Sequence, residues 1–152
     1  MKIRYKIAIL FFCFSVVGFS QNKAWFTNSG EAKTYAVENK VPIMLIFAGS
    51  DWCKPCMMFK HDILLNDIFQ KYLLTHFALL YLDFPMQAKN KLTPEQKTQN
   101  ELLADKYNKS GFFPNIVIIN PNGKVTGQLN FKQQTTEVFI EQCNALLSKI
   151  EK

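Results

Sequence analysis

The sequence is poor in the residues that build nucleic-acid-binding surfaces. Its only arginine is Arg4, and its lysines stand singly among apolar and acidic residues rather than in clusters beside stacking aromatic side chains. Domains that bind nucleic acid carry such clusters as a basic patch or stripe. We therefore expect no nucleic acid among the partners of this chain.

Apolar runs long enough to cross a bilayer are missing as well. The most apolar stretch, Ile7 to Phe19, has thirteen residues, whereas a spanning helix needs about 20. It follows a basic start with Lys2, Arg4 and Lys6, and it ends in small residues around Ser20. This three-part pattern predicts a signal peptide over residues 1–20, cleaved near Ser20, and export to the periplasm or cell envelope.

The rest of the chain, residues 21–152, is long enough to form one hydrophobic core of ordinary size but too short for two domains that each have their own core. Removing the three basic residues of the signal peptide from the 18 in the chain leaves 15, which against 12 acidic residues gives a net charge of +3. Internal repeats and low-complexity stretches are absent from the sequence. We expect one domain over 21–152, with a monomer as the default state.

Hydrophobic patterns in this domain alternate between strand and helix. Pro42 precedes an apolar run, 43–47, with the length and two-sided hydrophobicity of a buried parallel strand. Similar runs predict strands over 77–83 and 115–120, and a tight turn after the latter predicts a hairpin partner over 124–131. Together with the helices described next, these strands predict an α/β fold.

Helix signals occupy the segments between these strands. Ser29 is the expected cap of a helix that runs to Asn39, while the helices after Asn66 and Thr93 begin at recognisable caps. Another helix is expected from Cys53 onward, and the last helix carries an apolar face of Phe139, Cys143, Leu146, Leu147 and Ile150. Cys143 is therefore expected in the core, because free cysteine is among the most buried residue types.

Two further cysteines, Cys53 and Cys56, stand at a strand-to-helix junction with two residues between them. At this spacing two thiols reach across one helical turn and can close a small disulfide ring. Unpaired amides and the helix dipole favour a thiolate at Cys53, and Lys54 adds a positive charge. We expect Cys53 to attack a partner disulfide and Cys56 to resolve the mixed disulfide that results.

Other uses of this cysteine pair fit the sequence less well. A structural disulfide of such short spacing closes a tiny loop and so stabilises little. A zinc site lacks two more ligands at suitable spacing, since the chain offers only Cys143, His61 and His76. Covalent haem attachment needs a histidine where Met57 stands. We expect no metal and no cofactor beyond the dithiol itself.

A resemblance to the thioredoxin superfamily rests on the segment Phe47-Ala48-Gly49-Ser50-Asp51-Trp52-Cys53-Lys54-Pro55-Cys56, on 79–83 and 104–107, and on Phe113-Pro114-Asn115. It spans roughly Trp25 to the C-terminus. The Gly-Ser-Asp-Trp-Cys form is most similar to exported thioredoxin-like domains, including the soluble C-terminal domain of the transmembrane disulfide reductase of bacterial envelopes.

The resemblance implies a thioredoxin-like fold, in which helices flank a central mixed β-sheet. It also implies that Cys53 is an exposed nucleophile, that Cys56 is the resolving thiol and that Pro114 is a cis-proline lying against the disulfide. In the family, the residue matching Phe113 offers backbone hydrogen bonds to an extended substrate strand. The expected substrate-binding residues are Trp52, Lys54, Pro55, Phe113 and Pro114.

This chain departs from thioredoxin itself at three positions. The buried aspartate and the lysine that help to move the proton of the second cysteine are replaced here by Ile46 and Leu79. Water or Asp51 is the remaining substitute, although Asp51 is equally well explained as a solvated turn residue with a local capping role. Lys54 replaces a glycine, and about 1 kcal/mol of thiolate stabilisation shifts the potential by only about 20 mV towards oxidising.

The sequence thus predicts an exported enzyme, a thiol:disulfide oxidoreductase that reduces disulfides of envelope proteins. Its partners would be disulfide-containing or dithiol proteins and a membrane electron donor. Three alternatives stay open: a disulfide oxidase or isomerase in the folding of exported proteins, a Cu(I)-delivery protein with His61 or His76 as third ligand, and a non-catalytic thioredoxin-fold binding module.

Overall fold

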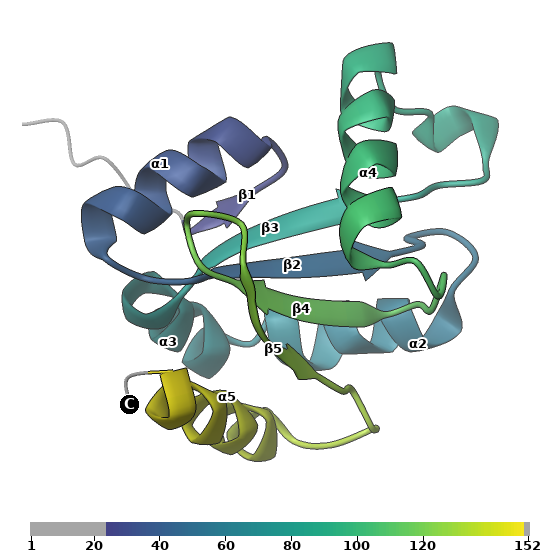
Figure 1. The fold of residues 1–152 in the computed structure, drawn as a ribbon. Helices are drawn as coiled ribbons and strands as arrows, with labels where there is room; N and C mark the ends of the chain where they lie inside the picture. Colours follow the sequence, from purple (N-terminus) through teal and green to yellow (C-terminus); the bar gives the residue numbers. More distant parts are fainter. Residues whose placement is uncertain (1–23, 151–152) are drawn as a thin grey trace, which may run out of the picture.

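The computed structural model describes residues 24–150 (Figure 1). The predicted signal peptide, residues 1–20, lies outside the described residues. Among residues 24–150, no helix has both the length and the apolar character to span a membrane.

A mixed sheet of five strands, in the order β1-β3-β2-β4-β5, forms the centre of the domain. The strands are β1 (Trp25–Phe26), β2 (Ile43–Ala48), β3 (Ala78–Asp83), β4 (Asn115–Ile119) and β5 (Val125–Leu129). β1, β3 and β2 are parallel, whereas β4 pairs antiparallel with β2 and β5 pairs antiparallel with β4. The predicted strands and the hairpin are confirmed, and the mixed sheet is the one that the resemblance implies.

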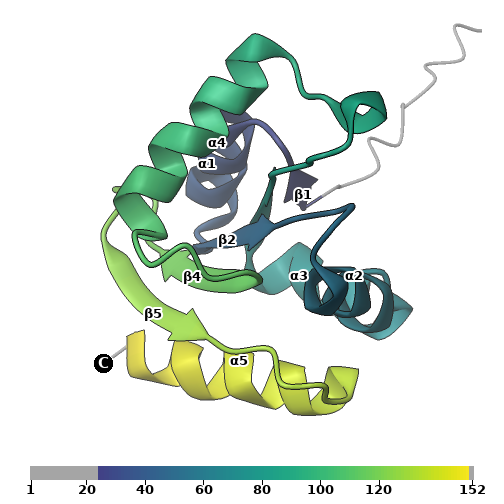
Figure 2. The ribbon, with the colours of Figure 1, turned by 90° about the vertical axis from the view of Figure 1, so that its right-hand side faces the viewer.

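Helices cover both faces of this sheet. α1 (Ser29–Asn39) and α4 (Pro94–Tyr107) lie on one face, and α2 (Lys54–Phe59), α3 (Asp67–His76) and α5 (Thr136–Ile150) lie on the other (Figures 1 and 2). A π-helical turn, η1 (Lys60–Leu64), continues α2, and a short 3-10 turn, η2 (Ala88–Asn90), stands between β3 and α4. The architecture is therefore three-layered, as an α/β fold requires.

β2 is buried at all six of its positions because it is the central strand of this arrangement. Met44 and Ile46 face the core between the sheet and α2, α3 and α5, whereas Leu45 and Phe47 face the core between the sheet and α1 and α4. This alternation follows from the opposite directions of successive side chains along a strand. It explains why the run 43–47 is hydrophobic on both sides.

Two local predictions need correction. α1 is capped by Asn28 and not by Ser29, because the Asn28 side chain accepts hydrogen bonds from the amides of Gly30 and Glu31, at 2.8 and 3.1 Å, while Ser29 is already inside the helix. The helix after Cys53 changes to π geometry from Lys60 onward, which its apolar spacing did not indicate. The caps at Asn66 and Thr93 are confirmed.

Cys143 lies fully buried on α5, in the core that also holds Phe139. Burial raises the pKa of its thiol to about 12. Since the thiolate is the nucleophilic form, both the raised pKa and the burial of Cys143 disfavour its reaction at neutral pH. The prediction that Cys143 is a core residue is confirmed.

Candidate active site

The two cysteines of the motif form a disulfide at the start of α2, directly after the loop that follows β2. Their sulfur atoms are 2.06 Å apart and their Cα atoms 5.3 Å apart. Cys53 is the N-cap of the helix, and its Sγ accepts a hydrogen bond from the backbone N–H of Cys56 at 3.2 Å. This N–H is one of the amides that a helix start leaves unpaired, so the helix start itself supplies a donor to the Cys53 sulfur.

Both cysteines are buried, which corrects the expectation that Cys53 is exposed. Cys53 is 4% exposed and Cys56 is 1% exposed. The Cys53 sulfur turns inward to bond Cys56 and to accept its N–H, and both residues belong to the core shared by α2, α3 and α5. Lys54 and Pro55, in the first turn of α2, are exposed beside them.

The loop before Cys53 is fixed by Ser50, which bonds to the end of the neighbouring strand. The Ser50 hydroxyl donates to one carboxylate oxygen of Asp83 at 2.6 Å, and the Ser50 amide donates to the other at 2.9 Å. The Cys53 amide also donates to the Gly49 carbonyl oxygen at 3.0 Å. The end of β3 thus determines the path of the chain into α2.

Trp52 forms a rim beside the disulfide. Its indole N–H donates to the Phe84 carbonyl oxygen at 2.7 Å, and its ring meets the Phe113 ring edge-on with centroids 5.3 Å apart. Phe113 also meets Phe84 edge-on at 5.4 Å. Three aromatic residues from three separate segments therefore meet at this rim.

Asp51 connects this loop to the segment after β3. Its carboxylate accepts hydrogen bonds from the amides of Met86 and Gln87 and from the Asn90 side chain, each at 2.9 Å. The pKa of Asp51 is lowered below its ordinary value, first by the Met86 amide and then by Asn90. The alternative that Asp51 acts as a local cap is wrong, because its partners are 35 to 39 residues away in the sequence.

The loop before β4 carries Phe112, Phe113 and Pro114. The Phe113–Pro114 peptide bond is cis, which confirms that expectation from the resemblance. Phe112 is 72% exposed, whereas Phe113 and Pro114 are half-buried. Of the two adjacent phenylalanines, Phe112 is therefore the one that faces solvent.

A buried polar network, which sequence reasoning missed, holds this loop in place. The Asn108 side chain donates to the Phe112 carbonyl oxygen at 3.0 Å, and the Asn115 side-chain Nδ2 donates to Asn108 Oδ1 at 2.8 Å. Gln128 on β5 completes the network with a 2.7 Å hydrogen bond to Asn115 Oδ1. An asparagine at the first position of an otherwise apolar strand is the signal that indicates it.

In thioredoxin, two titratable residues help to move the proton of the second cysteine, which corresponds to Cys56 here. The matching positions in this chain are Ile46 and Leu79, which are fully buried and apolar and cannot titrate. Tyr81, which pairs with Ile46 across the sheet, is a buried neighbour. Burial, with the charge of Asp83, raises the pKa of Tyr81 to about 12. Its hydroxyl is the only buried side-chain polar atom without a hydrogen-bond partner among the described residues.

Residues 24–150 contain no group of three His, Cys, Asp or Glu side chains that could hold a metal ion. His61 pairs with its neighbour Asp62 at 2.8 Å, and His76 stacks on Tyr72 at 3.9 Å between ring centroids. Neither histidine joins the cysteine pair in such a group among these residues.

Comparison with known proteins agrees with this geometry. The family model of the thioredoxin-like domain matches residues 29–138. The disulfide bond reductase DsbH of Chlamydia pneumoniae is 30% identical over 117 residues, which are 77% of this chain and 69% of that protein. A solved DsbH oxidoreductase superposes with a TM-score of 0.74 at 28% identity, covering 82% of this chain and 83% of that one.

More distant structures share the fold. A thioredoxin from Thermus thermophilus has a TM-score of 0.60 at 20% identity, covering 82% of this chain and 87% of its own. The reduced C-terminal domain of DsbD from Neisseria meningitidis has a TM-score of 0.51 at 20% identity, covering 79% of this chain and 97% of its own.

Proposed function

The chain belongs to the thioredoxin-like family and is a thiol:disulfide oxidoreductase, and from that premise we propose that it reduces disulfides of exported proteins with the Cys53/Cys56 dithiol. The observation that carries the proposal is the position of the pair, with Cys53 capping α2 and the Cys56 amide donating to its sulfur. The name of the 30% identical relative, a disulfide bond reductase, supports the reducing direction.

Cys53 is the proposed nucleophile. Its thiolate attacks one sulfur of the target disulfide, the target bond breaks, and one target cysteine leaves as a thiolate that takes up a proton. The α2 amides and the exposed Lys54 ammonium favour the thiolate form of Cys53 before the attack.

Cys56 is the proposed resolving residue. After losing its proton, it attacks Cys53 Sγ in the mixed disulfide, which breaks the bond to the target and releases the second target thiolate. Two electrons have then passed to the target, and the protein holds the Cys53–Cys56 disulfide. A dithiol donor must return these electrons, and we assign that role to a membrane electron donor.

The substrate-binding surface consists of residues around the pair: Trp52, Lys54, Pro55, Phe113 and Pro114. Exposure of Lys54 and Pro55 and the contact between Trp52 and Phe113 support this assignment. A target backbone would lie along Phe113, next to the cis-proline. Cys53 is 4% exposed as a residue in the disulfide form, and the reaction of the reduced protein needs its sulfur to be accessible to the target.

Export belongs to the same proposal. The pattern over residues 1–20 supports a signal peptide cleaved near Ser20 and a place in the periplasm or cell envelope. Mass measurement of the protein recovered from the envelope tests this, because a mass that includes residues 1–20 contradicts cleavage.

The decisive experiment traps the intermediate. The Cys56→Ser variant should accumulate mixed disulfides through Cys53 that dithiothreitol releases, and the further change Cys143→Ser should leave the adducts unchanged. A Cys56→Ser protein that captures no target contradicts the proposed mechanism.

The direction of the reaction is tested by the reduction potential of the Cys53/Cys56 pair. A value of about −270 mV, as in thioredoxin, supports a reductase, whereas about −120 mV indicates an oxidase.

A further inference from the structure

The segment after β3, residues 84–92, lies against the active-site loop. Asp51, two residues before Cys53, binds the backbone of Met86 and Gln87, and the Gln87 side chain returns a hydrogen bond to the Asp51 carbonyl oxygen at 3.2 Å. Asn90 adds the hydrogen bond to the Asp51 carboxylate described above. One side chain therefore fixes three residues of the segment beside the disulfide.

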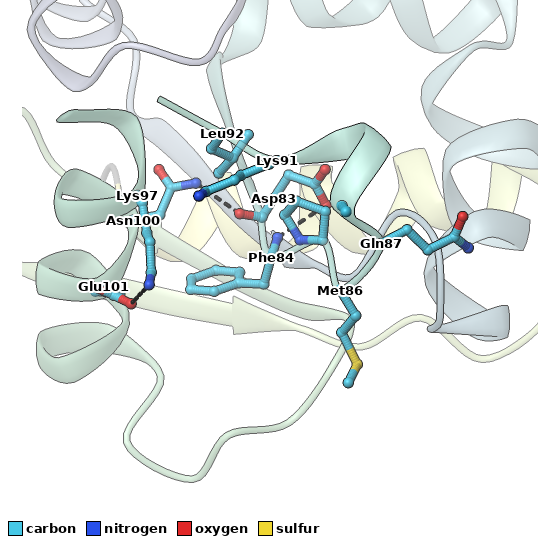
Figure 3. Close-up of a pocket in the computed structure, with 11 residues that line it drawn as sticks. Asp83, Phe84, Met86, Gln87, Lys91, Leu92, Lys97, Asn100 and Glu101 are labelled. Carbon is cyan, nitrogen blue, oxygen red and sulfur yellow. Dashed lines mark hydrogen bonds and ion pairs between the residues drawn. The ribbon is translucent and has the colours of Figure 1, made fainter. Parts of the chain in front are cut away.

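Met86 is the most exposed large apolar side chain on this segment, at 77%. It stands at a pocket of about 360 Å³ between the segment and the start of α4. Figure 3 shows Phe84 and Met86 leaving the segment in different directions, with Lys97, Asn100 and Glu101 contributed by α4. The apolar residues of the lining are Phe84, Pro85, Met86, Ala88 and Leu92.

Most polar groups of the pocket already have partners. Lys97 pairs with Glu101 at 3.6 Å, and the buried Asn100 donates to the Asp83 carbonyl oxygen at 2.8 Å. The Asp83 carboxylate is bound by Ser50. The surface that the pocket offers to a ligand is therefore mainly apolar. A volume of this size falls within the range of small-ligand pockets.

The pocket is continuous with the rim of the active site through Phe84. Phe84 lines the pocket, its ring meets Phe113, and its carbonyl oxygen receives the indole N–H of Trp52. The segment is also hydrogen-bonded to Asp51, which stands two residues before Cys53 in the sequence. We therefore expect a target chain bound at Cys53 to pass near the pocket, with its residues about 3.3–3.6 Å apart where it is extended.

We propose that Met86 and the adjoining pocket bind an apolar side chain of the target polypeptide, a few residues from its disulfide-bonded cysteine, and that Asp51 is the residue that positions them. The inference rests on the proposed function and adds the class of target: extended polypeptides with a large apolar side chain near the cysteine. Binding there holds the target disulfide beside Cys53 and lowers KM, while the exchange chemistry stays with the two cysteines.

The experiment uses ten-residue peptides, each joined through its single cysteine to glutathione, with Leu or Ser placed two to six residues from the cysteine on either side. Reduced wild-type protein should show a kcat/KM about tenfold higher for the Leu peptide than for the Ser peptide at one of these positions. The difference should arise from KM and not from kcat. Its size is the one expected for one buried apolar contact. Met86→Gln should reduce this ratio to below about twofold, and Met86→Leu should keep it.

The matched control is Ile68→Gln on α3, which changes an apolar residue that is 52% exposed on the opposite face of the sheet and should keep the ratio. Asp51→Ala should lower the ratio as Met86→Gln does. A wild-type protein without preference for Leu at any position, or a Met86→Gln variant that keeps the preference, overturns the pocket assignment. An unchanged ratio in Asp51→Ala overturns the positioning role.

The same peptides separate this inference from the proposed function. Wild-type protein that reduces the Ser peptides but does not prefer Leu retains its redox function and lacks the pocket interaction. Wild-type protein that reduces none of the peptides contradicts the proposed function itself.

Discussion

Gly49 lies under the indole of Trp52, so closely that a Cβ on Gly49 would stand 2.3 Å from Trp52 Cε2. The indole is fixed in this place by its hydrogen bond to Phe84 and its contact with Phe113. Glycine at this position therefore allows the rim of the site to close onto the backbone of the loop.

Replacing Gly49 by alanine should displace the Trp52 ring from Phe84. We expect a loss of about 1–3 kcal/mol in the free energy of unfolding, which is the usual cost of overpacking, and a slower reduction of protein disulfides. Urea denaturation followed by fluorescence in a Trp25→Phe background reports on Trp52 alone. Unchanged emission and stability in that background would show that the ring is not held where the structure places it.

The Asn108–Asn115 pair predicts a stability effect at the cis-proline loop. Asn115→Ala removes the partner of the buried Asn108 Oδ1 and of the Gln128 side-chain amide, and the expected loss in free energy of unfolding is about 1–3 kcal/mol. Gln128→Ala, which removes the exposed end of the network, serves as control and should cost less than about 0.5 kcal/mol. Equal losses in the two variants, measured by urea denaturation, would contradict the importance of the buried pair.

The burial of Cys143 predicts how many thiols react with an alkylating reagent before and after unfolding. In the native disulfide form no thiol should react with an alkylating reagent at pH 8, because burial raises the pKa of Cys143 to about 12. Denaturation of the protein without residues 1–20 and without reductant should expose a single reactive thiol. Mass spectrometry before and after denaturation gives the count, and rapid labelling of the native protein would refute the burial argument.

Asp51 predicts a dependence of stability on pH. Its pKa is lowered by the Met86 amide and by Asn90, so folding stabilises the ionised carboxylate relative to the unfolded chain. The contribution is fully present above the ordinary pKa of 3.8 and is lost as the pH falls through the lower folded value. The difference in unfolding free energy between wild type and Asp51→Ala should be constant at neutral pH and should shrink below 3.8. A difference that does not change down to pH 2 contradicts the charged hydrogen bonds.

Features encoded by nearby residues were accessible from the sequence. The hydrophobic run at 43–47 predicted the buried central strand, Thr93 predicted the start of α4, and helical spacing predicted a buried Cys143. In each case the cause lies within a few residues, because caps and periodicity are local properties. The resemblance added the cis peptide bond at Pro114, which spacing alone does not indicate.

Features that depend on distant contacts were not accessible. The partners of Asp51 lie 35 to 39 residues away, and Asn115 joins residues from the end of α4 and from β5. β1 has only two residues, too few for a recognisable pattern. The burial of Cys53 follows from tertiary packing around the disulfide, which no local pattern encodes.

The hydrogen bond from the Cys56 amide to Cys53 exists only after α2 has formed. α2 has six residues, and isolated helices of that length are unstable in water, so its start depends on the packed domain. In an unfolded chain the same cysteines have the ordinary thiol pKa of about 8.5 and little thiolate at neutral pH. Under the proposed mechanism, completion of folding is therefore the step that activates Cys53, and a newly made chain carries two thiols of ordinary reactivity until then.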